Sequence, residues 1–162
     1  MIYKLTGLLL MVALIAGCSE EPSAKSMQPP ERKQMVMEEI IPVRNMDFSQ
    51  IARGGQIFNK NCAECHGPAG QGADNWRQKG SDGRFPAPPL NGTGHAWHHP
   101  YAQLKQAIKD GTVNAGGSMP AWREKLSEQD IEDVMAWFMS KWPDELYTAW
   151  YKNNEKSKRT GS

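Results

Sequence analysis

Apolar residues recur with a helical period in three segments of the chain, residues 47–62, 101–110 and 127–142. The second segment is followed by Gly111, a common helix stop, and the third opens with the capping-box sequence Ser-Glu-Gln-Asp at Ser127. No segment alternates apolar and polar residues for long enough to predict a strand. The pattern therefore predicts an all-α fold.

Residues 67–100, between the first two predicted helices, contain seven glycines and five prolines but no periodic segment. A compact domain seldom contains a loop of this length without secondary structure of its own. Three short helices also supply only a small hydrophobic core. Both features are explained if a large apolar group lies at the centre of the domain and the loop wraps around it.

Two of the three cysteines precede this loop in the sequence Cys-Ala-Glu-Cys-His, from Cys62 to His66. A dithiol redox centre is expected at the start of a helix after a strand, whereas Cys62 and Cys65 follow a helix. A zinc site needs two more ligands, and the chain has no second cysteine pair, although histidines occur within residues 95–99. Haem attachment uses the whole motif, because two thiols bond the vinyl groups and the histidine ligates iron. The motif therefore favours haem over its two rivals.

Residues 47–143 resemble the class I cytochromes c. The resemblance rests on a helix with a glycine and an aromatic residue, the Cys-x-x-Cys-His motif, a proline-bearing loop, a Met-Pro turn and a last helix rich in aromatic residues. It implies a small cytochrome c-like helical fold wrapped around one covalently attached haem c. It also implies an electron-transfer protein, not an enzyme, that exchanges single electrons with redox partner proteins.

The resemblance also implies roles for individual residues. Cys62 and Cys65 would form the thioethers, His66 would be the proximal iron ligand, and Met119 would be the sixth ligand. The two glycines before Met119 let the backbone approach the haem, and Pro120 stiffens the turn. The alternative is that Met119 is an ordinary packing methionine.

The segment Phe-Pro-Ala-Pro-Pro-Leu-Asn-Gly resembles the Pro-x-Leu motif of the family. By this resemblance the carbonyl of Pro88 accepts the Nδ1–H of His66, which fixes the tautomer of the ligand. Leu90 is expected to pack on the haem face. Three prolines crowd this segment, so Pro86 or Pro89 could take the role of Pro88.

Three further aromatic or glycine positions match the family. Gly55 and Phe58 match its N-terminal helix contact, and Trp137 or Phe138 is the expected partner on the last helix. A glycine inside a helix lowers its stability by about 1 kcal/mol relative to alanine. Close contact with the partner helix explains why glycine is tolerated there. Trp97 is expected to donate its indole N–H to a haem propionate.

The sequence Gly-His-Ala-Trp-His-His-Pro carries more histidines than propionate contacts require. We interpret His95, His98 and His99 as a solvated loop surface. A copper site, or a histidine that replaces Met119 on the iron, is the alternative. The corresponding alternative functions are a haem sensor or peroxidase-like protein with open or bis-histidine iron, and a copper-handling lipoprotein.

The N-terminus predicts export and a membrane anchor. Residues 1–17 have the charge and apolar run of a signal peptide and end in Leu-Ile-Ala-Gly before Cys18, which resembles a bacterial lipobox. Cys18 is therefore expected to carry a lipid. Residues 18–46, with scattered prolines and mixed charges, are expected to form a flexible tether. The predicted location is a bacterial membrane, facing the periplasm or the cell exterior. An ordinary signal peptide with an incidental cysteine is the alternative.

The C-terminal residues 144–162 form a polar tail with aromatic residues near its start. Its first half could wrap onto the domain, and its end is predicted to be disordered. The chain has 19 basic and 18 acidic residues and no basic stripe, so the sequence gives no sign of nucleic-acid binding. We expect a monomer.

Overall fold

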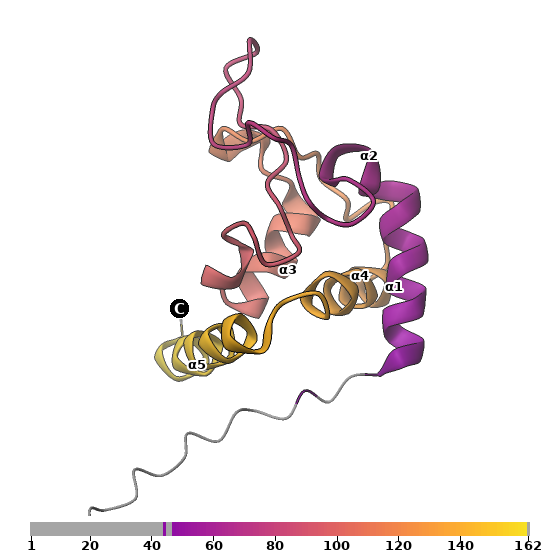
Figure 1. The fold of residues 1–162 in the computed structure, drawn as a ribbon, viewed down its shortest axis with the longest axis vertical. Coiled ribbons are helices and arrows are strands. Elements are labelled where there is room, and N and C mark those ends of the chain that lie inside the picture. The colour runs from indigo at the N-terminus through magenta and orange to yellow at the C-terminus, as the bar shows by residue number, and fades with distance from the viewer. Residues whose placement is uncertain (1–43, 45–46, 162) are drawn as a thin grey trace, which may run out of the picture. The chain divides into compact units, whose positions relative to one another are not determined.

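The computed structural model describes Arg44 and residues 47–161 (Figure 1). These residues belong to one unit, residues 39–162, whereas the other unit, residues 1–38, lies outside the described part. The predicted signal peptide, the lipid site Cys18 and all of the predicted tether except Arg44 are likewise outside it. The helical elements of the described part are α1 (Phe48–Asn61), α2 (Ala63–His66), η1 (Ala96–His98), α3 (Tyr101–Asp110), η2 (Val113–Ala115), α4 (Glu128–Met139) and α5 (Asp144–Thr160).

The predicted all-α fold is confirmed. Within residues 47–161 the β structure consists of one isolated parallel bridge between Phe85 and Gly117. The three periodic segments of the sequence correspond to α1, α3 and α4, and the Gly111 that follows α3 has a left-handed φ of 73°. The long loop 67–100 contains only the single 3₁₀ turn η1.

Side-chain caps set where α1 and α4 begin. Asp47 Oδ1 accepts the backbone N–H groups of Ser49 at 2.9 Å and Gln50 at 3.2 Å, which satisfies donors that a helix leaves unpaired. At α4, Ser127 and Asp130 form the reciprocal capping box that the sequence predicts.

The end of the chain differs from the sequence prediction. Helix α4 ends at Met139, before the predicted limit at residue 142, and α5 continues as a helix to Thr160. The prediction of disorder at the end of the tail is therefore wrong. Proline at the N-cap, acidic residues in the first turn and basic residues in the last turn all favour this helix. Its inner face is fixed by packing, since Trp150 and Asn154 are buried.

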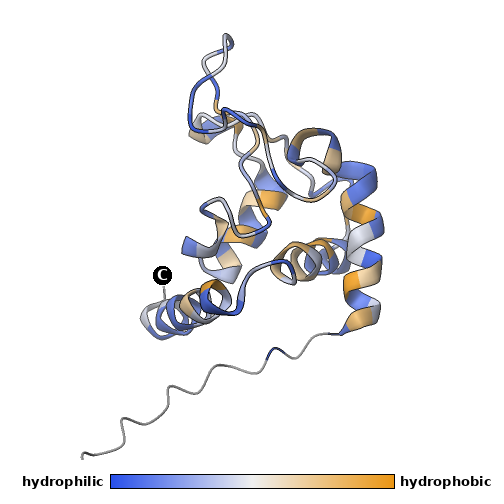
Figure 2. Ribbon diagram, viewed as in Figure 1, coloured by the Kyte–Doolittle hydropathy of each residue, from blue (hydrophilic) through white to orange (hydrophobic). Residues whose placement is uncertain are grey.

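The tightest contact of the fold joins α1 to α4. The ring of Phe58 stacks on that of Trp137, with centroids 4.1 Å apart, so Trp137 is the partner on the last periodic helix. Gly54 is buried, and a Cβ there would lie 2.5 Å from the carbonyl carbon of Asp133. In Figure 2, α4 carries more hydrophobic residues than α5, which is mainly hydrophilic. The core therefore centres on α4.

Helix α5 holds the turn that precedes α3. Asn154 Oδ1 accepts the N–H of Tyr101, the first residue of α3, at 2.9 Å and so caps that helix from another element. Asn153 Nδ2 and Trp150 Nε1 donate to the carbonyls of residues 98 and 99 at 2.7 and 3.1 Å. One face of α5 thus fixes consecutive backbone groups of the loop.

Candidate haem site

The Cys-x-x-Cys-His motif lies at the end of α1. Cys62 caps α1 and donates its backbone N–H to the carbonyl of Phe58 at 2.8 Å, and the next residues form the short helix α2. His66 closes α2 by donating its backbone N–H to the carbonyl of Cys62 at 2.9 Å. Gly67, with φ 75°, then turns the chain away. One tight turn thus carries both thiols and the imidazole.

The two cysteines of the motif are not joined in a disulfide. Cys62 is half-buried and Cys65 is exposed. Burial, with a smaller contribution from the neighbouring Cys65, raises the pKa of Cys62 to about 11. Burial thus disfavours the thiolate form of Cys62 at neutral pH.

The imidazole of His66 is oriented by a backbone carbonyl. The ring is 7 % exposed, and its Nδ1 lies 2.9 Å from the carbonyl oxygen of Pro88. Because a carbonyl only accepts hydrogen bonds, Nδ1 carries the proton and Nε2 carries the lone pair. Burial lowers the pKa of His66, although the bond to Pro88 acts in the opposite direction. This neutral, oriented ring fits the axial position of a haem iron.

Gly72 holds the proline segment against the motif. It has a φ of 72°, and a Cβ there would lie 2.6 Å from the carbonyl carbon of Pro88. Its backbone N–H is donated to the carbonyl of His66 at 2.7 Å. The sequence analysis did not single out Gly72. In the sequence Gly72 is one of seven glycines in the loop, and nothing distinguishes it from the others. Its role depends on a close approach to Pro88, 16 positions later, which only the folded chain brings about.

Leu90 contacts the core of the fold, whereas the indole N–H of Trp97 is bound within its own turn. The carbonyl of Leu90 accepts the indole N–H of Trp142 at 2.8 Å, and its side chain packs against the buried core cluster. The indole N–H of Trp97 is donated to the carbonyl of Gly94 at 3.2 Å. The indole N–H of Trp97, which is expected to donate to a haem propionate, is therefore bound to a carbonyl of its own turn in this structure.

The Met119 loop closes on the end of α3. Thr112 donates its backbone N–H to the carbonyl of Met119 at 2.9 Å, and the N–H of Met119 is donated to Thr112 Oγ1 at 3.3 Å. A Cβ on Gly111 would lie 2.6 Å from the carbonyl oxygen of Met119, so only glycine permits this approach. The sequence analysis treated Gly111 as a helix stop and did not single out Thr112. Together these two residues position Met119.

The proline loop and the Met119 loop are joined at Phe85. The N–H of Phe85 is donated to the carbonyl of Gly116 at 3.0 Å, and Ser118 Oγ donates to the carbonyl of Phe85 at 3.1 Å. The loop that supplies Pro88 and the loop that supplies Met119 thus run side by side at this point. Two segments far apart in the sequence therefore form one structural unit.

The histidine-rich turn divides into two aromatic stacks. The ring of His95 stacks on Trp76 at a centroid distance of 5.3 Å and meets His99 edge-on at 5.4 Å. His98 stacks on Trp97 at 3.7 Å. Within residues 47–161 no three side chains of histidine, cysteine, aspartate or glutamate are grouped so that they could hold a metal ion.

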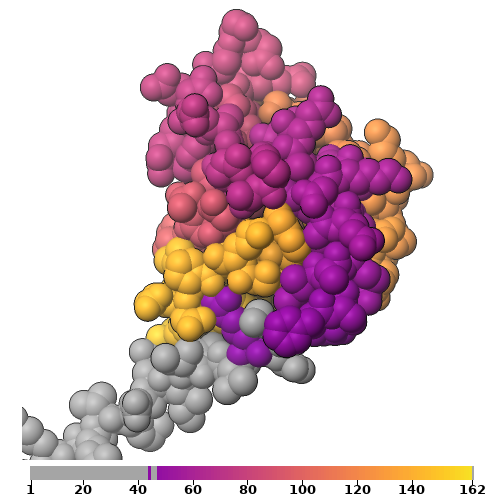
Figure 3. All heavy atoms as spheres, turned by 45° about the vertical axis from the view of Figure 1, so that its right-hand side comes forward, coloured from indigo at the N-terminus to yellow at the C-terminus, as the bar shows by residue number. Residues whose placement is uncertain are grey.

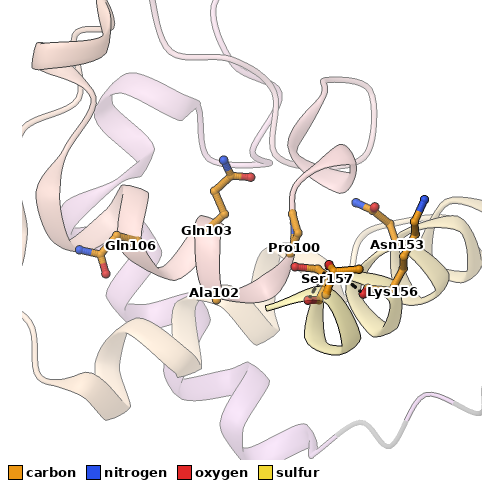
Figure 4. Close-up of a pocket in the computed structure, with 8 residues that line it drawn as sticks. Pro100, Ala102, Gln103, Gln106, Asn153, Lys156 and Ser157 are labelled. Carbon is orange, nitrogen blue, oxygen red and sulfur yellow. Dashed lines mark hydrogen bonds between the residues drawn. The ribbon is translucent and has the colours of Figure 1, made fainter. Parts of the chain in front are cut away.

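A pocket of about 680 Å³ lies between α3 and α5 (Figure 4). Its walls are mainly amide and hydroxyl side chains with one lysine, and they include Gln103, Gln106, Asn153 and Lys156. None of the predicted haem-site residues lines it. The pocket is therefore separate from the candidate haem site.

The helical fold and the Cys-x-x-Cys-His site are those of a class I cytochrome c. Residues 49–138 match the family model described as "Cytochrome C oxidase, cbb3-type, subunit III", more than half of the chain, and the chain belongs to this family. No solved structure matches the chain. None of the helices between residues 47 and 161 is both long and apolar enough to cross a bilayer.

Curated relatives include small cytochromes and a larger oxidase subunit. Cytochrome c6 of Leptolyngbya boryana is 30 % identical over 96 residues, which are 57 % of this chain and 94 % of that protein. Cytochrome c6 of Cladophora glomerata is 33 % identical over 91 residues, 55 % of this chain and 86 % of that protein. The cbb3-type cytochrome c oxidase subunit CcoP of Azospirillum sp. (strain B510) is 33 % identical over 88 residues, 54 % of this chain but 27 % of the subunit.

The family settles the cofactor and the class of activity. The chain is an electron-transfer protein with covalently bound haem c, as the sequence predicts. The matched span is only 27 % of the length of that oxidase subunit.

Proposed function

We propose that this protein is a monomeric single-electron carrier held at a membrane by a lipid on Cys18 and exposed to the periplasm or the cell exterior. In this proposal Cys62 and Cys65 form the thioethers, and His66 and Met119 are the two axial ligands of the haem iron. Haem c, when bound, supplies an iron that alternates between ferric and ferrous forms.

The observation that carries the proposal is the contact between His66 Nδ1 and the carbonyl of Pro88, 2.9 Å apart. It fixes the tautomer that presents Nε2 as a ligand, and it does so within the attachment motif itself. The buried ring has little freedom to turn, since it is only 7 % exposed. An axial ligand held in this way stays in place when the charge on the iron changes.

The role proposed for Met119 is supported by how its loop is held. The backbone of Met119 is fixed in both directions by Thr112, and the loop is tied to the proline segment through Phe85. A thioether ligand on such a loop raises the reduction potential relative to an oxygen or second imidazole ligand. Fixed ligands on both sides suit electron transfer because little has to move between the two oxidation states.

The membrane anchor rests on the sequence before the described residues. The lipobox-like sequence ending at Cys18 supports lipidation, and the proline-bearing segment that follows supports a tether. Such a tether lets the domain reach a redox partner while it stays at the membrane. The relatives include both an oxidase subunit and cytochromes c6, so their names fit either a free carrier or a component of a complex.

The optical spectrum of the ferric protein, matured in cells that attach haem c, tests the axial ligands. We expect the weak long-wavelength band of iron–methionine ligation in the wild type and its loss in Met119→Leu. The matched control is Met139→Leu, which changes a buried methionine of α4 and should keep the band.

Other results would change the assignment. Covalent haem without the band would indicate bis-histidine or open iron and would favour the sensor or peroxidase-like alternative. Loss of the band in both variants would show that it reports stability and not ligation by Met119. Absence of covalent haem would contradict the central claim. Mass spectrometry of the exported protein, compared with Cys18→Ala, tests the lipid separately.

A further inference from the structure

Arg44 is the described residue of the predicted tether, and it is bound to the domain. Its Nη2 donates to the carbonyl of Trp142 at 2.6 Å and lies 3.2 Å from Asp144 Oδ1. Its guanidinium also lies over the ring of Tyr147, 4.2 Å from the centroid. The side chain is only 12 % exposed. Three kinds of contact therefore converge on one cation.

The chemistry of these partners suits arginine. The turn between α4 and α5 presents the carbonyl of Trp142 to an outside donor, because Pro143 prevents the helix from continuing. The planar guanidinium can donate in its own plane to this carbonyl while its face stacks on Tyr147, a combination that a lysine ammonium does not offer. The ion pair adds little, because the Asp144 side chain is 76 % exposed.

We propose that Arg44 docks the N-terminal linker into a socket formed by the Trp142 carbonyl, Asp144 and Tyr147. Arg44 then lies where residues of α1, α4 and α5 come together. Figure 3 shows the face on which α1 (indigo) and the C-terminal part of the chain (orange to yellow) lie side by side. Arg44 also lines a pocket of about 220 Å³ between these helices. The occupant of the Arg44 socket is thus a segment of this chain.

This docking sets where the linker meets the domain relative to the predicted haem site, an inference that rests on the proposed function. Helix α1 has 14 residues and therefore spans about 21 Å between Arg44 and the Cys-x-x-Cys-His motif. The socket holds Arg44 at the opposite end of α1 from Cys62.

Limited trypsin digestion of the mature haem protein tests the docking. Trypsin must take the basic side chain into its S1 pocket, so cleavage after Arg44 requires the arginine to leave the socket. The cleavage rate after Lys33, in the same linker, is the internal reference. We expect slow cleavage after Arg44 in the wild type and about a tenfold increase in Tyr147→Leu, which removes the aromatic face. Tyr147→Phe keeps that face and should stay slow.

Two further variants separate docking from the stability of α5. Arg44→Lys leaves the core untouched and remains a trypsin site, and we expect faster cleavage because the ammonium cannot donate and stack together. Glu145→Gln removes a charge from the same turn as Asp144 and should leave the rate unchanged. Cleavage after Arg44 as fast as after Lys33 in the wild type would overturn the proposal. Unchanged rates in both Tyr147→Leu and Arg44→Lys would do the same.

The docking and the proposed function can fail independently. The haem spectrum of each preparation, recorded before digestion, reports the ligands of the iron without reference to the linker. A protein with an iron–methionine band and an unprotected Arg44 would retain the carrier assignment and lose the socket. A protected Arg44 in a protein without that band would retain the socket and lose the proposed ligands.

Discussion

The contact between α1 and α4 and the two loops around the motif are held together in different ways. Between the helices, large side chains are buried: Phe58 is 1 % exposed and Met135 is 0 % exposed. In the loops the large apolar side chains stay partly in solvent, since Phe85 is 41 % and Val113 is 40 % exposed. The helix pair is a hydrophobic core, whereas the loops are joined by backbone hydrogen bonds and close glycine contacts.

This difference shows which part depends on the cofactor. Burial of apolar side chains stabilises the helix pair without help from another group. The loops bury little of their own, so a bound haem would supply apolar surface on which they can pack. Changes in the helix pair should therefore lower the stability of the whole domain, while changes in the loops should act mainly on the haem site.

The largest effect is expected at the helix crossing. In Gly54→Ala the new methyl group would lie 2.5 Å from the carbonyl carbon of Asp133, and neither backbone can turn away. We expect a loss of about 3 kcal/mol in the free energy of unfolding, measured by urea denaturation of the haem protein. In Gly55→Ala the methyl group meets only the ring of Trp137 at 2.9 Å, and alanine favours the helix, so a loss below about 1 kcal/mol is expected. Equal losses in both variants would contradict this account of the crossing.

The next prediction compares two loop glycines and separates the cost of a close contact from the cost of a left-handed backbone conformation. Gly72 and Gly83 share a φ of 72°, but a Cβ on Gly83 would meet nothing within 4 Å. Gly83→Ala should therefore show strain alone, about 1 kcal/mol. Gly72→Ala adds the collision with the Pro88 carbonyl and should lose about 2 kcal/mol or more. It should also change the haem spectrum, which Gly83→Ala should not, since Pro88 orients His66. Identical behaviour of the two variants would rule out a positioning role for Gly72.

Much of the helix pair could be predicted from the sequence because its signals are local. The capping box at Ser127 and the period of apolar residues predicted α4. The match of Gly55 and Phe58 to the family indicated that α1 crosses another helix there. The choice between two aromatic partners needed the structure, which has Trp137 on Phe58. Helix α5 was missed because its low hydropathy hides a stabilisation that comes from tertiary contacts of Trp150 and Asn154.

The loops were predictable only where a motif marked them. Cys62 and His66 stand in such a motif, and the structure selects Pro88 from three candidate prolines for the contact with His66. Gly72 and Thr112 carry no motif, because their importance comes from residues that approach them only in the folded chain. The roles of His66 and Met119 as iron ligands remain predictions, which the optical spectrum of the ferric protein tests.

A smaller effect with a pH signature is expected from the ion pair between α1 and α4. Arg53 Nε donates to Asp133 Oδ2 at 2.7 Å, and Gln129 Nε2 donates to Oδ1 at 2.7 Å. Burial raises the pKa of Asp133, but the hydrogen bonds from Arg53 and Gln129 outweigh it and hold this pKa below its ordinary value. Asp133→Asn should lower the free energy of unfolding by about 1.5 kcal/mol at neutral pH, a modest value because Arg53 is half exposed.

The sign of the pH dependence follows from the lowered pKa. The folded state binds the proton more weakly than the unfolded state, so the contribution of Asp133 is complete above the unfolded value near pH 4 and is lost as the pH falls through the folded value. The urea stability curves of wild type and Asp133→Asn should therefore run parallel above about pH 5 and converge below about pH 4. A constant gap down to the lowest accessible pH would show that the carboxylate charge does not contribute.

The smallest effect on the free energy of unfolding is expected in the Met119 loop, where a change should act on the haem site more than on stability. Thr112→Val keeps the backbone bond from Thr112 to the carbonyl of Met119 but removes the hydroxyl that accepts the Met119 N–H at 3.3 Å. A loss of only about 0.5–1 kcal/mol is expected in unfolding. The iron–methionine band should nevertheless vanish at lower temperature than in the wild type. Thr93→Val removes a hydroxyl from an exposed turn and should leave the band unchanged. A band that persists equally in both variants would show that Thr112 does not position Met119, and that the loop is held at Gly111 and Phe85 alone.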